Sequence, residues 1–372
     1  MEKYSDINQK ADMRINEVLL KNLTRMAIVF YVLAISLSGA LLQAQSSKDE
    51  GVRLIPVDDK HRIDVYINGS LFTSYQYPDS IEKTFLYPVI APNGVVITRG
   101  FPLEPRKGDR VDHPHHIGIW FNHGNVNGLD FWNNSSAIPA DKKDLYGRIV
   151  HKRTNTVAGG KRGILEVVLD WNDNKGNTLL TEKAMFIFTG DKNSRTIDHI
   201  STLTALNGPV TFGDSKEGLF AIRVDRAFEM PSNESLIFID DKGNQTAVKA
   251  TDNKGVTGMY SSAKGLKGDS VWGTRNDWVM LSGFKDSVPV TIAIFDNPKN
   301  PGYPAYAHAR GYGLFAMNNF GQNSYDPKLT KFNMTIEKGK SITLYHRFYV
   351  KSGVELTTEE ANKIFKKFSN EY

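Results

Sequence analysis

Apolar and polar residues alternate in short segments along most of this chain. The alternation is clear over residues 63–67 and again over 165–171. Side chains of a β-strand point to opposite faces in turn, so a period of two indicates strands with one buried face. Such segments, separated by turn residues, predict an all-β protein, a large antiparallel β-sandwich. Further apolar runs that fit short strands lie at 184–189, 235–239, 279–284 and 289–295.

Turn residues between these runs predict two hairpins. Asn68 and Gly69 tolerate positive φ, which is typical of a two-residue loop that joins 63–67 to Leu71–Tyr75. The turn at 337–340 lies between alternating segments at 332–336 and 342–348, and it predicts a second hairpin.

One helix is expected, close to the C-terminus. Thr357 and Glu360 have the spacing of a capping box, in which each side chain pairs with the other residue's backbone N–H. Apolar residues then follow at helical spacing as far as Phe368. The prediction is therefore a β-sandwich with one short C-terminal helix.

The first 44 residues carry a different pattern. The apolar run Met26–Leu42 follows Lys21 and Arg25, and small residues come after it. This order is typical of a secretory signal peptide, here with an extended start and cleavage after Ala44. The sequence predicts a signal peptide over 1–44, a single β-sandwich domain over 45–372, and a periplasmic or secreted protein. Contact with a membrane is expected only if the signal peptide is not cleaved.

The composition excludes several classes of function. The chain has no cysteine, so it has no disulfide framework, thiol nucleophile or cysteine-ligated metal centre. Its 46 Lys and Arg exceed its 41 Asp and Glu by five, without a long basic run, so nucleic-acid binding is not expected. Nucleophile-elbow, Walker, dinucleotide-binding and H-E-x-x-H motifs are missing from the sequence.

Histidine is concentrated in one short segment. Four of the nine histidines are His113, His115, His116 and His123. A buried imidazole without a hydrogen-bond partner costs about 1–3 kcal/mol, so this density indicates use. Two uses remain open. The histidines could transfer protons and bind substrate hydroxyls, or two or three of them could bind a divalent metal. The sequence itself requires no cofactor.

Other segments supply partners for these histidines. Glu217 precedes an alternating strand and is a candidate acid or base, with a solvated turn as the alternative. Arg99 and Arg310 could bind a carboxylate or sulfate, or form salt bridges within the scaffold. The predicted catalytic residues are His113, His115, His116, His123, Glu217 and His308. The predicted substrate-binding residues are Arg99, Asn127, Trp132, Lys216 and Arg310. No function is predicted for His61, His151, His199 or His346.

The chain resembles the bacterial PmoA-like family in three segments, which are D-H-P-H-H-I-G-I-W-F-N-H-G-N-V-N-G-L-D-F-W at 112–132, K-E-G-L-F-A-I-R-V at 216–224 and H-A-R-G-Y-G-L-F-A at 308–316. Members are often labelled methane oxygenase, a multi-span membrane subunit, whereas this chain has one apolar segment, at its start. The resemblance implies a galactose-mutarotase-like supersandwich, an architecture that aldose epimerases, glycoside hydrolases and polysaccharide lyases share. Related genes in Bacteroidota lie in clusters for polysaccharide breakdown.

What the resemblance implies for this chain is an exported carbohydrate-active protein that degrades polysaccharide or oligosaccharide as a hydrolase, lyase or epimerase. A mutarotase-like mechanism would pair His113, His115 or His116 as acid with Glu217 as base. The partner would be an oligosaccharide or polysaccharide fragment, and the slight positive charge is compatible with an acidic one. Two alternatives stay open, namely a non-catalytic carbohydrate-binding protein and a histidine-ligated metalloenzyme.

Overall fold

The computed structural model describes residues 50–249 and 252–372, and Gly51–Tyr372 form one compact unit. The signal peptide predicted over 1–44 lies outside the described residues. Within the described part of the chain, no helix has the length and apolar character needed to cross a membrane.

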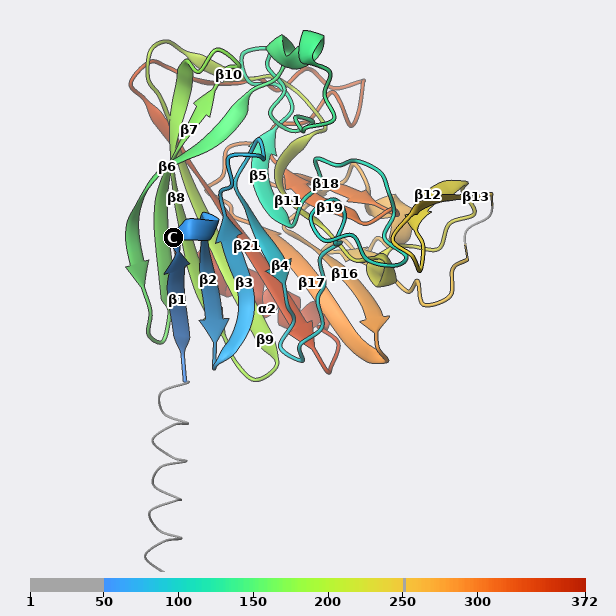
Figure 1. Cartoon of the computed structure of the whole chain (residues 1–372). Coiled ribbons are helices and arrows are strands. Elements are labelled where there is room, and N and C mark those ends of the chain that lie inside the picture. Colours follow the sequence, from blue (N-terminus) through green and yellow to red (C-terminus); the bar gives the residue numbers. More distant parts are fainter. Residues whose placement is uncertain (1–49, 250–251) are drawn as a thin grey trace, which may run out of the picture. The chain divides into compact units, whose positions relative to one another are not determined.

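Two large antiparallel sheets make up this unit (Figure 1). The nine-stranded sheet has the order β1 (Val52–Val57), β2 (Arg62–Ile67), β3 (Ser70–Gln76), β4 (Phe85–Val89), β5 (Ile119–His123), β11 (Gly218–Arg223), β19 (Leu314–Asn318), β18 (Ala305–Arg310) and β15 (Arg275–Asn276). The eight-stranded sheet has the order β14 (Met259–Ser262), β16 (Trp278–Lys285), β17 (Val288–Asp296), β21 (Ser341–Ser352), β9 (Ser194–Ala205), β8 (Thr178–Gly190), β7 (Gly163–Asn172) and β6 (Arg148–Ala158).

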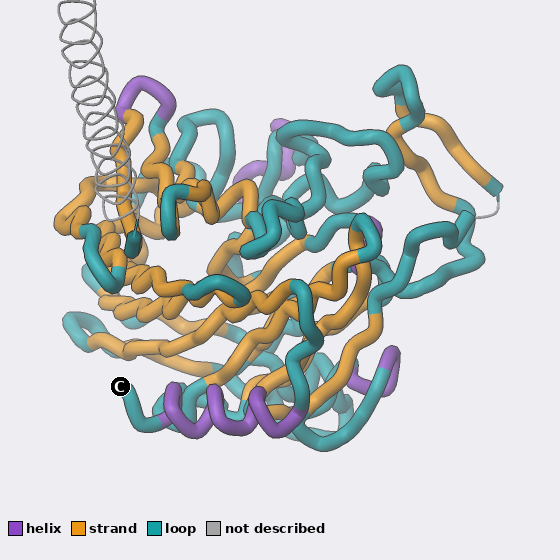
Figure 2. The backbone as a smooth tube through the Cα atoms, turned by 90° about the horizontal axis from the view of Figure 1, so that it is seen from below, coloured by secondary structure: helices purple, strands orange, loops and turns teal. Residues whose placement is uncertain are grey.

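Smaller elements connect and cover the sheets. Two short ribbons pair β10 (Val210–Phe212) with β20 (Met334–Ile336), and β12 (Leu236–Ile239) with β13 (Gln245–Val248). Single 3₁₀ turns are η1 (Asp58–Lys60), η2 (Ala140–Leu145), η3 (Arg226–Phe228) and η4 (Gly268–Val271). The helix α2 (Thr358–Ser369) runs along the outside of the strand layers (Figure 2).

Three apolar clusters hold this arrangement together. The largest lies between the two sheets and contains the inward side chains of both, such as Val65, Phe121, Phe220 and Phe348. A second cluster packs α2 against the outer face of the eight-stranded sheet, where Phe368 joins Trp278 and Phe295. The third lies on the outer face of the nine-stranded sheet and underlies the site described below.

The main sequence predictions about the fold are confirmed. The structure is an antiparallel β-sandwich whose helix begins with the predicted capping box of Thr357 and Glu360. The hairpin between β2 and β3 turns at Asn68 and Gly69, both with positive φ.

The predicted hairpin of 332–336 with 342–348 is wrong. The strand β20 pairs with β10, whereas β21 lies between β17 and β9. Both hydrogen-bonding edges of β21 are therefore occupied, and β20 has to pair elsewhere. The turn at 337–340 forms as expected, with the Lys340 N–H donating to the Glu337 carbonyl.

Candidate functional site

The strand register places one row of side chains across the outer face of the nine-stranded sheet. Trp120 pairs with Ala221, Ala221 with Ala316, and Ala316 with His308. Directly paired residues point to the same face, and the two alanines leave room between the large end members. The indole of Trp132 lies there, with its centroid 5.2 Å from that of Trp120 and 6.4 Å from the parallel ring of His308.

A second row on the same face brings in two arginines. Arg223 and Arg310 both pair with Leu314, one from each side. The Arg223 side chain is fully buried and Arg310 is exposed. Sequence reasoning missed Arg223, although a charged residue within the apolar segment 219–224 was a signal that it has a buried partner.

The loop that carries the histidines is held by Arg99. Its guanidinium donates to the backbone carbonyls of Arg110, Asp112, His113 and His116 at 2.8–3.1 Å. It also donates to the Asp112 carboxylate at 2.6 Å. Arg99 is buried and its hydrogen bonds go to the loop, so it does not make the predicted contact with a substrate. Its visible role is to position the histidines.

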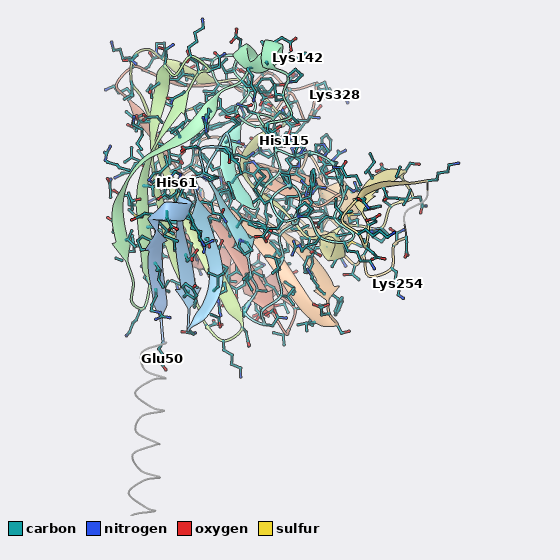
Figure 3. The ribbon with its side chains drawn as sticks, viewed as in Figure 1. Glu50, His61, His115, Lys142, Lys254 and Lys328 are labelled. Carbon is teal, nitrogen blue, oxygen red and sulfur yellow. The ribbon has the colours of Figure 1, made fainter. Side chains whose placement is uncertain are left out.

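Three aromatic rings stack at the surface end of this loop. The rings of His113, His116 and Tyr312 are parallel within 7°, and His113 lies 4.8 Å from His116 and 5.0 Å from Tyr312. The His113 side chain is 41% exposed, whereas His115 and His116 are buried. Figure 3 shows His115 among the loops and strands, well apart from His61. Of the histidines His113, His115 and His116, only His113 exposes its imidazole to solvent.

Burial sets the protonation state of the two inner histidines. It lowers the pKa of His115 to about 2, helped by the charge of Lys83, and it holds the pKa of His116 well below its ordinary value. Both rings are therefore neutral near pH 7. They can donate or accept hydrogen bonds there, but they do not take up protons.

Two predicted residues lie elsewhere. Along β5, side chains alternate between faces, so His123 points inward when Trp120 points outward. Its Nε2 donates to the Gly213 carbonyl at 2.7 Å, and its ring packs on Phe212 in the core. Asn127 is an exposed turn residue with positive φ that hydrogen-bonds to Thr211. The structure does not bring either one to the other histidines.

Lys216 and Glu217 immediately precede β11. Burial raises the pKa of Glu217, while the charges of Lys216 and His113 act in the opposite direction and that of Asp130 adds to the rise. The Lys216 Nζ lies 3.7 Å from the Glu217 carboxylate. The Lys216 carbonyl accepts hydrogen bonds from Tyr325 and from the Nδ1 of His308, so the backbone here is fixed.

Tyr312 connects these groups. Its ring stacks on His113, and burial raises its pKa, with the negative charge of Glu217 adding to the rise. We use the name histidine site for His113, His115, His116, Glu217, His308 and Tyr312. Trp132 is fully buried beneath this site, so its indole forms the floor and is not an exposed surface for stacking.

Lys83 is a further member that sequence reasoning missed. Its Nζ donates to the His115 carbonyl at 2.5 Å and lies 4.9 Å from the centroid of the Trp120 ring. Burial lowers its pKa to about 7. A lysine in the polar loop between β3 and β4 gave no pattern that distinguished it from a surface lysine.

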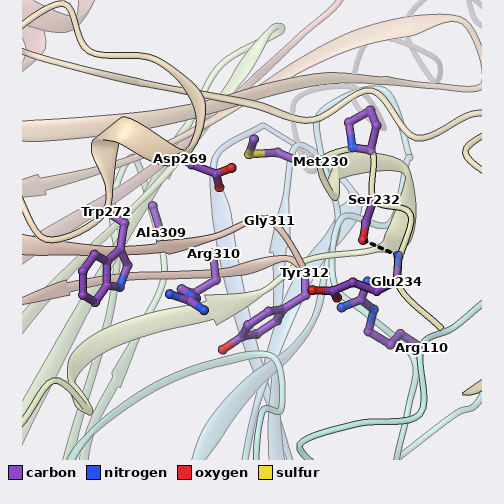
Figure 4. Close-up of a pocket in the computed structure, with 11 residues that line it drawn as sticks. Arg110, Met230, Ser232, Glu234, Asp269, Trp272, Ala309, Arg310, Gly311 and Tyr312 are labelled. Carbon is purple, nitrogen blue, oxygen red and sulfur yellow. Dashed lines mark hydrogen bonds between the residues drawn. The ribbon is translucent and has the colours of Figure 1, made fainter. Parts of the chain in front are cut away.

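A pocket of about 440 Å³ adjoins the histidine site at Tyr312 (Figure 4). Its walls combine aromatic rings with charged groups. The lining includes Arg110, Asp269, Trp272, Arg310, Tyr312 and Glu234. Of the residues predicted to bind substrate, only Arg310 reaches this pocket.

The rings of the histidine site do not form a metal-binding set. No group of three or more His, Asp or Glu side chains that could hold a metal ion occurs among the residues the structure describes. Stacked imidazoles present their faces to one another, so the nitrogen lone pairs of His113 and His116 do not converge. The His116 Nδ1 is moreover directed at Arg223. This geometry favours hydrogen bonding over metal ligation.

Several ring nitrogens in the floor lack partners. Within the described chain, no hydrogen-bond partner is present for the His115 and His116 Nε2 atoms or for the Trp120 and Trp132 Nε1 atoms. Buried polar groups in folded proteins are usually paired. A concentration of unpaired donors is therefore typical of a site completed by water or by oxygen atoms of a ligand.

Comparison with protein families gives one match. Residues 62–366 match the model described as "Family of unknown function (DUF6807)". No curated protein matches the chain.

Solved structures with similar strand arrangements include several with sugar-related descriptions. The galactosidase domain of an α-galactosidase–sucrose kinase is 10% identical, with a TM-score of 0.37 over 80% of this chain and 41% of that one. The α-galactosidase from Lactobacillus brevis is 7% identical, with a TM-score of 0.34 over 81% of this chain and 39% of that one. A galactose mutarotase-like protein from Clostridium acetobutylicum is 10% identical, with a TM-score of 0.34 over 82% of this chain and 99% of that one. The chain thus spans about two fifths of each galactosidase structure, and the likeness concerns strand arrangement alone.

Proposed function

The chain belongs to the DUF6807 family, whose function is unknown, and we propose that it is an enzyme that acts on a carbohydrate by acid–base catalysis at the histidine site. One observation carries this proposal. Tyr312 stacks on the exposed imidazole of His113 and forms a wall of the adjoining pocket, and the negative charge of Glu217 adds to the rise in its pKa. Tyr312 therefore connects the proposed proton-transferring residues, His113 and Glu217, with a binding pocket.

Glu217 and His113 suit the two roles in proton transfer. A carboxyl group whose pKa is raised by burial is closer to the pH at which it can exchange protons efficiently. An exposed imidazole nearby supplies the complementary group. A carboxyl group and an imidazole can divide the acid and base roles of one reaction between them. His115 and His116 then support His113 and contribute hydrogen bonds.

The pocket favours a sugar as the ligand. The rings of Trp272 and Tyr312 can cover the apolar face of a pyranose, while the Asp269 carboxylate can accept hydrogen bonds from its hydroxyl groups. Its volume of about 440 Å³ is within the usual range for small-molecule sites. The proposal includes export by the predicted signal peptide at 1–44 and a step in polysaccharide or oligosaccharide degradation.

One observation favours a second candidate, a carbohydrate-binding protein without catalysis. His115 and His116 are buried and neutral near pH 7, so they resemble binding or structural groups more than proton carriers. That protein would use the same pocket and the same residues. The two candidates differ only in whether a bound sugar is changed.

Incubation with a panel of oligosaccharides tests the proposal. Mass spectrometry detects hydrolysis as an added water and elimination as an unsaturated product, and NMR detects epimerisation at constant mass. Glu217→Gln should lower turnover by about a hundredfold or more while affinity stays within a few fold. Glu337→Gln, in the exposed turn after β20, is the matched control and should behave as the unchanged protein.

Two results would decide against this proposal, the first against catalysis and the second against the role of Glu217. Tight binding with no chemical change in any bound sugar would identify the binding protein instead. Turnover that survives in Glu217→Gln would remove Glu217 from the mechanism.

A further inference from the structure

Three guanidinium groups surround the ring of Tyr312. The centroid of that ring lies 4.9 Å from Arg223, 5.9 Å from Arg110 and 5.8 Å from Arg310. Both Arg110 and Arg310 line the pocket beside this ring (Figure 4). Positive charge is therefore concentrated at one wall of the pocket.

The buried part of this charge is only partly compensated. Arg99, Arg110 and Arg223 are all buried, and the carboxylates paired with them are Asp112 and Glu229. Arg99 and Arg223 approach the same Asp112 oxygen, Oδ1, at 2.6 Å and 2.7 Å, and its Oδ2 lies 3.8 Å from Arg110. Burial raises the pKa of Glu229 to about 7, which leaves this carboxyl only partly ionised near neutral pH. Asp109, also buried, adds a third negative charge near Arg99, so the carboxylates of this cluster leave Arg110 as the position for an external anion.

Arg110 is the buried guanidinium that reaches the pocket with bonding capacity to spare. Its carboxylate neighbours are 3.5 Å away at Glu229 and 3.8 Å away at Asp112. Charge-assisted hydrogen bonds are shorter, about 2.7–2.9 Å. Within the described chain its Nε has no hydrogen-bond partner.

Arg310 is held in place without an anion. Its guanidinium lies 5.7 Å from the ring of Trp272 and 5.8 Å from that of Tyr312, and no ion pair to it occurs among the described residues. Stacking on aromatic faces orients an arginine while leaving its N–H groups free for a ligand.

We propose that the substrate is a sugar with one anionic group, a carboxylate or a sulfate ester, which binds between Arg110 and Arg310 at the Tyr312 wall. This proposal rests on the proposed function and narrows its substrate class. Asp269 and Glu234 also line the pocket, and their carboxylates disfavour further negative charge on the ligand. The pocket therefore fits a ring with a single anionic group better than a densely charged one.

The test uses isothermal titration calorimetry to compare acidic oligosaccharides with uncharged counterparts from which the anionic groups have been removed. One arm uses oligogalacturonides and oligoalginates beside carboxyl-reduced counterparts. The other arm uses sulfated galactan oligosaccharides beside desulfated counterparts. We expect one arm to contain a ligand that binds at least tenfold more tightly in its acidic form, with an affinity that falls as salt rises.

Variants locate the anion. Arg310→Gln should weaken binding of the acidic form at least tenfold and leave the neutral form within about twofold. Lys338→Gln removes the same charge from the exposed turn after β20 and should leave both affinities unchanged. Because Arg310 is exposed, its replacement is not expected to impair folding, whereas Arg110→Gln would also change the buried cluster.

The possible outcomes separate this inference from the function it rests on. Turnover or tight binding of neutral oligosaccharides, with acidic forms no better, would overturn the anionic substrate and leave carbohydrate catalysis intact. Equal loss of acidic and neutral binding in Arg310→Gln would also overturn it, since the arginine would then read hydroxyl groups. Absence of binding to every oligosaccharide in both arms would overturn both proposals together.

Discussion

The Nη1 of Arg223 lies 3.2 Å from the Nδ1 of His116. A guanidinium can only donate, so the Nδ1 must accept, and the proton of this neutral imidazole resides on Nε2. Burial lowers the pKa of His116, and the charges of His115 and Arg223 lower it further. Burial keeps His116 neutral, and the Arg223 contact makes it a fixed N–H donor at the base of the histidine site.

NMR can test this tautomer directly. We expect the His116 ring to remain neutral between pH 5 and 8, with its proton on Nε2, because protonation of Nδ1 would place two donors face to face. Long-range ¹H–¹⁵N correlation spectra report both the tautomer and any titration. A midpoint near the ordinary histidine pKa of about 6.5, or a proton on Nδ1, would contradict this reading of the Arg223 contact.

Arg99 should be hard to replace, even by another cation. Its planar fork reaches the carbonyls of Arg110, Asp112, His113 and His116, and a lysine ammonium cannot reproduce that set. Arg99→Lys should therefore lower the free energy of unfolding by about 2–4 kcal/mol, since buried carbonyls would lose their donors. Urea denaturation followed by circular dichroism measures this loss.

The control for Arg99 is Arg153→Lys on β6, where the side chain is exposed. It should change the free energy of unfolding by less than about 0.5 kcal/mol. If both variants had the same stability, the idea that Arg99 organises the histidine loop would have to be abandoned.

Stability should fall steeply in mild acid. Burial lowers the pKa of seven histidines, to about 4 for His123, His151 and His308, to about 3 for His199 and His346, to about 2 for His115, and well below the ordinary value for His116. Below pH 6.5 the unfolded chain binds protons that the folded chain does not. Each such group therefore lowers the free energy of unfolding by up to about 1.4 kcal/mol per pH unit as the pH falls toward its folded value.

Buried carboxyl groups act in the opposite direction. Burial raises the pKa of Glu182 and Glu229 to about 7 and that of Asp296 to about 6. Their contribution is present at low pH and is lost as the pH rises through those values. The histidines outnumber them, so a net loss of several kcal/mol is expected between pH 6.5 and 4.5. Denaturation curves over that range measure it, and a flat profile would mean that these imidazoles are protonated in the folded protein.

The fold was largely predictable because a strand with one buried face has alternating apolar and polar residues, a pattern visible within a few neighbouring positions. Alternation over 63–67 and 165–171, the Asn68-Gly69 turn and the Thr357 cap each arise from neighbouring residues. The pairing of β20 does not, since it depends on which edges of β21 are already occupied by β9 and β17. Local pattern predicts strands better than it predicts their partners.

The site was predictable only in part, for a similar reason. The histidine density identified the loop, and Glu217, His308 and Arg310 do lie near it. The sequence could not tell that His123 points to the other face of β5, or that Arg99 binds the loop itself. Arg110 and Tyr312 matter through contacts between distant strands and loops, for which no residue spacing gives a signal.

Lys216 offers a last test, of Glu217 itself. The Lys216 Nζ lies 3.7 Å from the Glu217 carboxylate, and its charge lowers the pKa of that group. Lys216→Gln removes this effect, so the pKa of Glu217 should rise. Whether Glu217 acts as base or acid, the limb of the kcat/KM profile that reports it should move to higher pH, by about half a pH unit because Lys216 is half exposed.

Salt and a matched variant make the Lys216 experiment specific. The difference should shrink at high ionic strength, which screens exposed charges. Lys338→Gln carries the same charge change far from the site and should leave the profile in place. A shift to lower pH, or the same shift in both variants, would mean that the titrating group in catalysis is not Glu217, and the proton-transfer role would pass to His113 alone.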